Sequence, residues 1–76
     1  MRQVADGEKY LVELGFSNVR VRHHGVLVRL EVEPAEIERL VSLRQPVSEF
    51  FKALGFTIVS VDLGGYRSGS LNEVLK

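Results

Sequence analysis

Three arginines in one alternating stretch are the residues of this chain best suited to bind an anion. Residues 18–33 read Asn-Val-Arg-Val-Arg-His-His-Gly-Val-Leu-Val-Arg-Leu-Glu-Val-Glu. A guanidinium group presents N–H donors in a planar fork that matches a phosphate. Because strand side chains alternate between two faces, one face is expected to carry Arg20, Arg22, Arg29 and Glu31. This pattern predicts either an anion site or simple cross-strand pairing of the arginines with Glu31 and Asp62.

The same stretch predicts an antiparallel hairpin whose turn lies at His24 and Gly25, since alternation on both sides of a glycine is typical of one. Its apolar positions would face the core, and they are Val19, Val21, Val28, Leu30 and Val32. His23 and His24 are adjacent and would point to opposite faces, which is poor geometry for a shared metal ion. We therefore expect no metal site there.

Helical patterns surround the hairpin. Apolar spacing predicts a helix from Gln3 to Leu14, and Gly7 is expected to weaken its first turn. Pro34 would begin a second helix, residues 42–46 would interrupt it, and Pro46 would begin a third. A strand rich in branched residues follows at 57–63. The fold class is therefore α+β, a two-layer sandwich of order αββααβ, with a three-stranded mixed sheet and helices on one face.

An internal similarity aligns residues 10–21 with residues 50–61, since each contains a helix end, a Leu-Gly-Phe joint and a strand. The similarity reflects either a duplication or the general preference for glycine at such joints. If the third strand lies parallel to the first, with a right-handed crossover, the first strand is central. Ser60 and Asp62 would then lie beside Arg20 and Arg22.

Composition restricts the class of protein. The 76 residues indicate one domain, and ten basic and ten acidic residues give no net charge. General nucleic-acid or membrane binders usually carry a positive excess. The chain has no cysteine, so a thiol nucleophile and a sulfur donor are excluded. No apolar run approaches the roughly 20 residues that span a bilayer, and a cytoplasmic location is expected.

The C-terminal part, residues 64–73, is rich in glycine and ends in a capping box of Ser70 and Glu73. Free N–H groups at a helix start suit an anion, so Arg67, Ser68 and Ser70 extend the candidate anion site. The alternative is a flexible tail with one short C-terminal helical turn. No catalytic residue is predicted, because paired carboxylates, a serine-histidine-aspartate set and a phosphate-binding loop are all missing from the pattern.

Several motifs together resemble the C-terminal domain of the ATP-dependent sacrificial sulfur transferases, a branch of the PP-loop ATP pyrophosphatase superfamily in nickel pincer cofactor biosynthesis for lactate racemase. The matching elements are Arg2-Gln-Val4, Leu14-Gly-Phe16, Val19-Arg-Val-Arg-His-His-Gly25, Arg29-Leu-Glu-Val32, Leu54-Gly-Phe56 and Asp62-Leu-Gly-Gly-Tyr-Arg-Ser-Gly-Ser-Leu-Asn-Glu73. They cover nearly the whole chain. The sequence departs from the family pattern at Val26, where an acidic residue is usual, and at Val28.

The resemblance implies an accessory domain, residues 1–76, that binds a phosphate-bearing substrate near Arg20, Arg22 and Arg67 and helps to form a homo-oligomer. It implies a PP-loop domain as partner, in cis or in trans, which would hold ATP and magnesium. No cofactor is expected in this chain, and the chain is not expected to be an enzyme by itself.

Two other functions fit the element order. Type II KH domains share it, but they clamp nucleic acid with a glycine loop between paired helices, and residues 42–46 contain no glycine. A nucleic-acid partner is therefore not favoured. A pure self-assembly domain is the other alternative.

Overall fold

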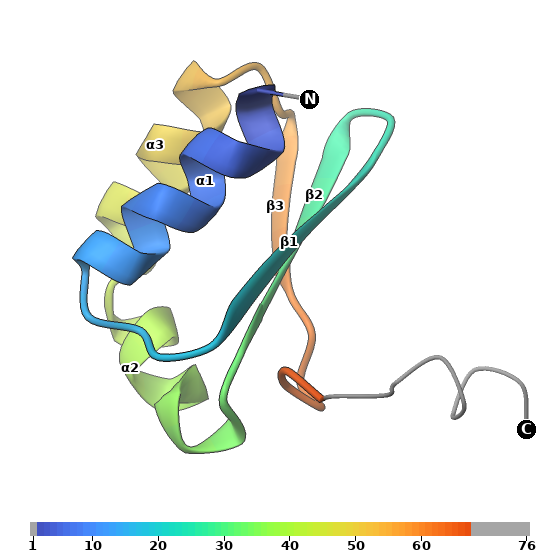
Figure 1. Cartoon of the computed structure of the whole chain (residues 1–76). Helices are drawn as coiled ribbons and strands as arrows, with labels where there is room; N and C mark the ends of the chain where they lie inside the picture. The colour runs from blue at the N-terminus through green and yellow to red at the C-terminus, as the bar shows by residue number, and fades with distance from the viewer. Residues whose placement is uncertain (1, 68–76) are drawn as a thin grey trace, which may run out of the picture.

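The computed structural model describes residues 2–67, which form two layers (Figure 1). The helices lie on one side of a three-stranded sheet, which confirms the predicted α+β class and the order αββααβ. The elements are α1 (Arg2–Glu13), β1 (Val19–His24), β2 (Leu27–Val32), the 3-10 helix η1 (Pro34–Glu36), α2 (Ile37–Ser42), α3 (Arg44–Ala53) and β3 (Ile58–Val61). The predicted C-terminal helical turn lies outside the described residues.

The sheet has the strand order β1-β2-β3, so β2 is central. β1 pairs with β2 in antiparallel orientation, and β3 pairs with β2 in parallel orientation. The expectation that the first strand is central and parallel to the third was wrong. The hairpin places β1 on one edge of β2, and the crossover through α2 and α3 returns the chain to the other edge, where β3 runs parallel to β2.

The register determines which side chains are neighbours on each face. Val21 lies opposite Leu30, and Val28 lies opposite Val59. These four side chains lie on the inner face of the sheet, which the helices cover. On the outer face Ser60 is the partner of Arg29. Ser60 and Asp62 therefore lie beside Arg29, and not beside Arg20 and Arg22 as expected, because β2 separates β3 from β1.

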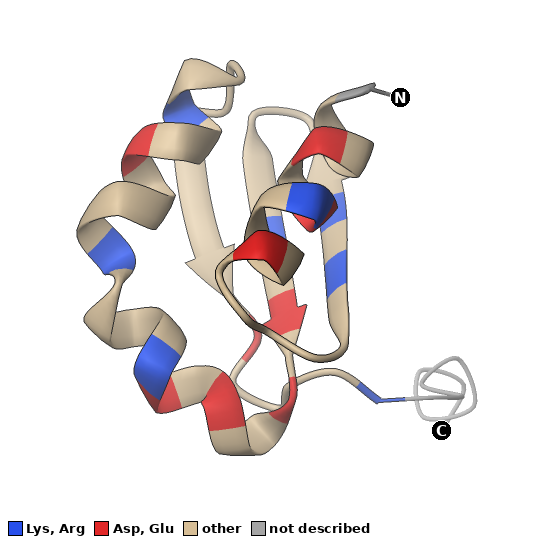
Figure 2. Cartoon of the chain, turned by 60° about the vertical axis from the view of Figure 1, so that its left-hand side comes forward, with Lys and Arg blue, Asp and Glu red and all other residues tan. Residues whose placement is uncertain are grey.

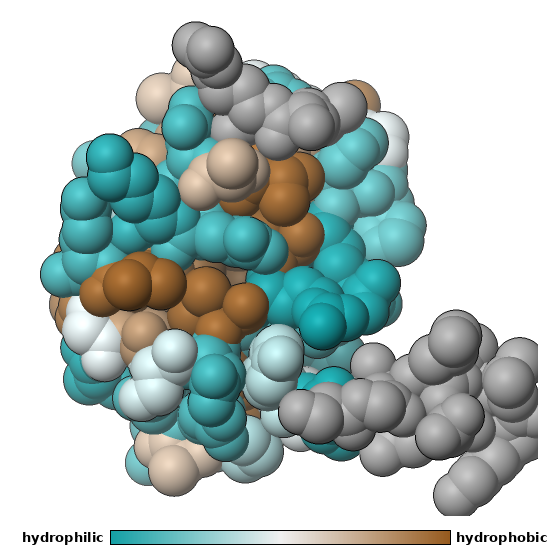
Figure 3. Space-filling view, in the orientation of Figure 1, coloured by the Kyte–Doolittle hydropathy of each residue, from teal (hydrophilic) through white to brown (hydrophobic). Residues whose placement is uncertain are grey.

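Ten apolar side chains of residues 2–67 form the buried core between the layers. They are Leu11, Phe16, Val21, Val28, Leu30, Val32, Leu40, Val47, Phe51 and Phe56. The predicted inner face of the hairpin is confirmed, since Val19 also packs against this core. In the view of Figure 3, apolar atoms reach the surface mainly over and beside α1, among larger hydrophilic areas.

Both Leu-Gly-Phe joints adopt the same helix-ending conformation. Gly15 and Gly55 have φ values of +101° and +114°, which glycine adopts without steric cost. The N–H of Phe16 donates to the Leu11 carbonyl and that of Phe56 to the Phe51 carbonyl, each over 3.2 Å, as in a Schellman cap. The helix ends expected at the two Leu-Gly-Phe joints are therefore confirmed, and each joint turns its phenylalanine into the core.

The break between α2 and α3 is narrower than expected, because only Leu43 separates the two helices. α3 begins at Arg44, two residues before the predicted start. Pro46 lies in the first turn, where its missing N–H removes no intrahelical hydrogen bond. The joint is therefore a tight corner and not a loop.

Gly7 has a packing role that the sequence did not indicate. A Cβ at this position would lie 2.9 Å from Cζ of Phe51 and closer still to Cε1. Only glycine lets α1 approach the Phe51 ring this closely. Tyr10 and Phe50 stack beside that contact, with ring centroids 3.9 Å apart.

We predict that Gly7→Ala destabilises the fold despite the better helix propensity of alanine. Alanine gains about 1 kcal/mol in helix propensity, but an overpacked core costs about 2 to 3 kcal/mol at such a close contact, for a net loss of roughly 1 to 2 kcal/mol. Urea unfolding followed by circular dichroism measures it. The control is Asp6→Ala on the exposed side of α1, expected within about 0.5 kcal/mol of the parent. A stabilised Gly7→Ala protein would contradict the packing argument.

Candidate functional site: the open face of the sheet

The sheet face that the helices do not cover carries a cluster of charged side chains. We call it the open face, and it comprises Arg20, Arg22, Arg29, Glu31, Ser60 and Asp62. Figure 2 shows its basic bands on the neighbouring strands β1 and β2, an acidic band on β2 and no charged band on β3. The sequence therefore placed the three arginines correctly on one face.

Glu31 is the centre of this cluster. Its side chain is 7% exposed, and its Oε2 atom lies 3.2 Å from Nε of Arg22 and 3.4 Å from Nη2 of Arg29. The two arginine side chains are 37% and 38% exposed. A carboxylate is buried without great cost only when cations and hydrogen bonds compensate it. Glu31 therefore draws two guanidinium groups from adjacent strands together.

Arg29 also approaches the end of β3. Its Nε atom lies 4.0 Å from Oδ2 of Asp62, which is an ion-pair distance but too long for a hydrogen bond. That Nε atom is buried and has no hydrogen-bond partner within the described part of the chain. The Ser60 hydroxyl donates to the Val28 carbonyl over 2.9 Å, so its proton is already used.

Tyr66 completes the face beside Arg20, and the sequence interpretation did not assign it a role. The guanidinium carbon of Arg20 lies 5.4 Å from the centroid of the Tyr66 ring, within the range of a cation–π contact. The Tyr66 N–H donates to the Val32 carbonyl over 2.7 Å. Gly65 allows this docking, since a Cβ there would lie 2.8 Å from the Val32 carbonyl oxygen. The only sequence signal was the Gly-Gly-Tyr-Arg run.

Arg67 follows Tyr66, and its guanidinium lies against Gly64, where a Cβ would clash with it. The same Cβ would be 3.2 Å from Oδ1 of Asp62, so Arg67 lies on the Asp62 side of the segment. Ser68 and Ser70, the other predicted anion ligands, lie outside the described residues.

The arrangement leaves donors available for an anion. Three arginines face two carboxylates, Glu31 and Asp62, which gives the open face a formal charge of +1. Glu31 occupies Nε of Arg22, and none of the hydrogen bonds among the described residues uses the Nη groups of that arginine. A phosphate could therefore be bound by Arg22 without displacing Glu31.

Residues 2–67 give less support to metal binding or to a membrane-spanning role. No group of three or more His, Asp or Glu side chains in this part of the chain is arranged to hold a metal ion. His23 pairs with Val28 on the inner face and His24 with Leu27 on the outer face, which confirms that the two rings diverge. None of the described helices is long and apolar enough to cross a membrane.

This chain is similar in sequence to one part of longer proteins. No family model matches the chain. The chain is 44% identical over 73 residues, 96% of its length, to the pyridinium-3,5-bisthiocarboxylic acid mononucleotide synthase of Lactiplantibacillus plantarum. It is 42% identical over 78 aligned positions, 99% of its length, to an uncharacterised protein of Synechocystis sp..

The chain spans only 26% and 29% of the length of these two relatives. The similarity therefore supports a domain related to one part of the synthase, in agreement with the resemblance seen in the motifs.

We predict that Glu31→Gln lowers stability by about 1 to 2 kcal/mol, because it removes the charge that two partly exposed arginines share. Thermal and urea unfolding measure this loss. Glu38→Gln on the exposed side of α2 is the matched control, with an expected change of less than about 0.5 kcal/mol. Equal stabilities of the two variants would show that Glu31 does not hold the face together.

Proposed function

We propose that this chain is an accessory substrate-binding domain of an ATP-dependent sulfur transferase and that its open face holds the phosphate of a mononucleotide. The observation that carries the proposal is the convergence of Arg22 and Arg29 on the buried Glu31 carboxylate, with Arg20 beside them on the same face against the Tyr66 ring. The name of the Lactiplantibacillus relative describes a mononucleotide, and a mononucleotide carries a phosphate group. Arginine is well suited to that group because of its bidentate geometry.

Each arginine would have a distinct part. Arg22 would bind phosphate through its Nη groups while its Nε stays on Glu31. Arg20 would add a second donor from the same strand, held in place by the Tyr66 ring. Arg67, Ser68 and Ser70 follow directly in sequence and would extend the site, with Asp62 as a supporting acid.

The chemical step is assigned to a partner. In this proposal a PP-loop domain, in cis or in trans, holds ATP and magnesium and activates the substrate in the cytoplasm. The open-face acids already face arginines, so they make a poor magnesium site. The domain itself would bind and orient the substrate and would contribute to a homo-oligomer.

The family departure at Val26 falls on the hairpin tip. The Val26 side chain is exposed, and its carbonyl accepts the N–H groups of Thr57 and Ile58 over 2.8 and 3.2 Å. The backbone role of this position does not depend on the side chain. We therefore propose that Val26 leaves phosphate binding on the open face intact.

Titration with nicotinic acid mononucleotide, followed by two-dimensional NMR of the whole chain, tests the proposal. The amides of β1 and β2 around Arg20, Arg22 and Arg29 are expected to shift, with millimolar affinity typical of a single exposed phosphate contact. Arg20→Ala and Arg22→Ala should each weaken binding by about threefold to tenfold, the equivalent of about 0.7 to 1.4 kcal/mol.

The matched control is Arg44→Ala, which deletes an exposed guanidinium on the helical side of the molecule and should leave phosphate affinity unchanged. Inorganic phosphate is the second probe, and it should compete with the mononucleotide. Shifts that ignore the open face, or equal losses in the Arg22 and Arg44 variants, would refute the assignment.

A further inference from the structure

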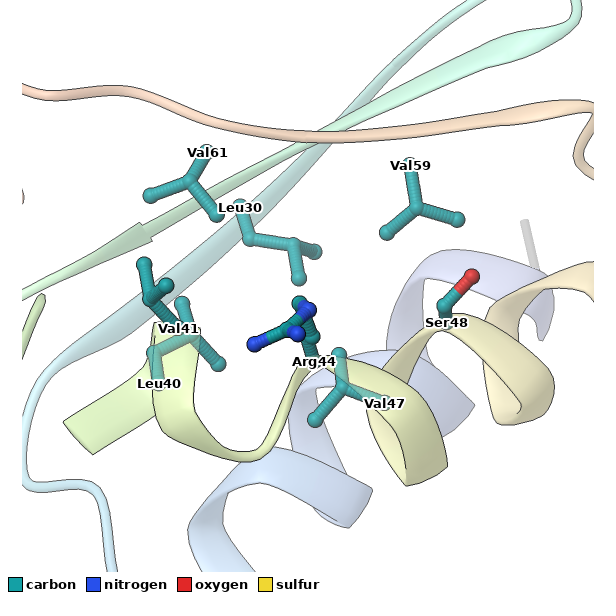
Figure 4. Close-up of a pocket in the computed structure, with 8 residues that line it drawn as sticks. All are labelled: Leu30, Leu40, Val41, Arg44, Val47, Ser48, Val59 and Val61. Atoms are coloured by element: carbon teal, nitrogen blue, oxygen red, sulfur yellow. The ribbon is translucent and has the colours of Figure 1, made fainter. Parts of the chain in front are cut away.

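A second surface lies on the helical side of the sheet, where no role has been assigned. A cavity of about 100 Å³ lies between β3 and the helices α2 and α3. Figure 4 shows Val59 and Val61 on one wall, Val41 and Val47 on the other, and the Arg44 guanidinium between them. We call this cavity and the adjoining edge of β3 the β3 groove.

The edge of β3 beside the groove has no strand partner in the described part of the chain. The N–H groups of Ile58 and Asp62 donate to the β2 side, to the carbonyls of Val26 and Leu30. Because backbone groups alternate along a strand, those of Val59 and Val61 point to the opposite side. Their N–H and C=O groups are therefore available to another extended backbone.

The two edges of the sheet differ in how they are protected. On β1, the Glu8 carboxylate of α1 accepts the Val21 N–H over 3.3 Å, so a side chain blocks that edge. β3 reads Ile-Val-Ser-Val and contains neither a charged residue nor a proline. Charged residues, lysine above all, and proline are the usual features that discourage strand pairing at a sheet edge. The unprotected edge is next to the apolar cavity.

The cavity and its rim indicate what kind of segment would fit. An apolar cavity of about 150 Å³ holds a benzene molecule, so this smaller one suits a single branched aliphatic side chain. A second, shallower hollow adjoins the cavity along α3, and Arg44 and Lys52 line it towards opposite ends of that helix. Neither side chain has an ion-pair partner among the described residues. Glu49 lies between them and accepts a hydrogen bond from Gln45 over 3.1 Å.

We propose that the β3 groove binds an extended segment of another polypeptide, which adds a fourth strand beside β3. Main-chain hydrogen bonds to Val59 and Val61 would supply the pairing, and a valine or leucine of the segment would fill the cavity. Acidic residues at its two ends would face Arg44 and Lys52. This inference does not depend on the proposed phosphate site, which lies on the other face of the sheet.

Two other occupants fit the groove less well. In an antiparallel pairing of β3 with a second copy, Arg44 of one chain would approach Lys52 of the other, and like charges repel. A nucleic-acid strand would gain contacts from the two cations, but the corner between α2 and α3 is the single residue Leu43, so no glycine loop clamps a phosphate backbone there.

The test uses the whole chain and the peptide acetyl-Glu-Thr-Val-Thr-Val-Thr-Glu-amide, monitored by NMR and amide hydrogen exchange. We expect the Val59 and Val61 amides to shift and to exchange at least about tenfold more slowly at saturation, as for newly hydrogen-bonded groups. A peptide with lysine in place of both glutamates is expected to bind about tenfold more weakly, since each end would meet a like charge.

Variants separate the contributions of charge and cavity. Arg44→Glu should weaken the acidic peptide about threefold to tenfold and Arg44→Lys much less, in keeping with one exposed charge pair. Ser48→Leu places a larger side chain at the groove wall and should reduce binding without loss of the folded NMR spectrum. Lys9→Glu on α1 is the charge-reversal control and should bind as the parent does.

Three outcomes would overturn the proposal. No protection of Val59 and Val61 at millimolar peptide would exclude strand addition. Shifts of the same groove that depend on protein concentration without peptide would assign it to a second copy. Groove shifts with single-stranded RNA that weaken steeply with salt, in the absence of peptide binding, would assign it to nucleic acid.

Discussion

The position of β2 at the centre of the sheet is the constraint on which the rest of the structure depends. Both of its edges are paired, and its inner residues Val28, Leu30 and Val32 are fully buried against the helices. The outer residue Glu31 is buried as well, on a face that no helix covers. A carboxylate in that place must be compensated by cations, and Arg22 of β1 and Arg29 of β2 therefore converge on it. The cluster that we propose as an anion site would thus also help to keep the sheet intact.

Two similar helix–glycine–strand units frame this central strand. In each, the carbonyl of the last leucine accepts a side-chain hydrogen bond from another helix, from Arg39 to Leu14 over 3.1 Å and from Gln3 to Leu54 over 2.5 Å. Arg39 also covers the Phe16 ring, with 4.1 Å from its guanidinium carbon to the ring centroid. The two joints therefore tie the helices to one another as well as to the sheet.

The fold presents two different surfaces on opposite sides of one thin sheet. The open face is polar and has a slight positive charge, which suits a small anion held by side chains. The β3 groove is apolar and has an unpaired backbone edge, which suits a polypeptide. In our two proposals, the open face would meet a substrate and the β3 groove would meet a protein segment.

The sequence by itself determined the local structure: the alternation placed the arginines opposite the valines of the hairpin, and the Leu-Gly-Phe joints marked both helix ends. These features depend on strand periodicity and on the left-handed conformation of glycine, which neighbouring residues specify. Only the tertiary structure decided that β2 is central, that Asp62 joins Arg29, that Tyr66 returns over Arg20 and that Gly7 admits the Phe51 ring. Each of these contacts joins segments distant in the sequence, and local periodicity carries no information about which edge or ring a distant segment will meet.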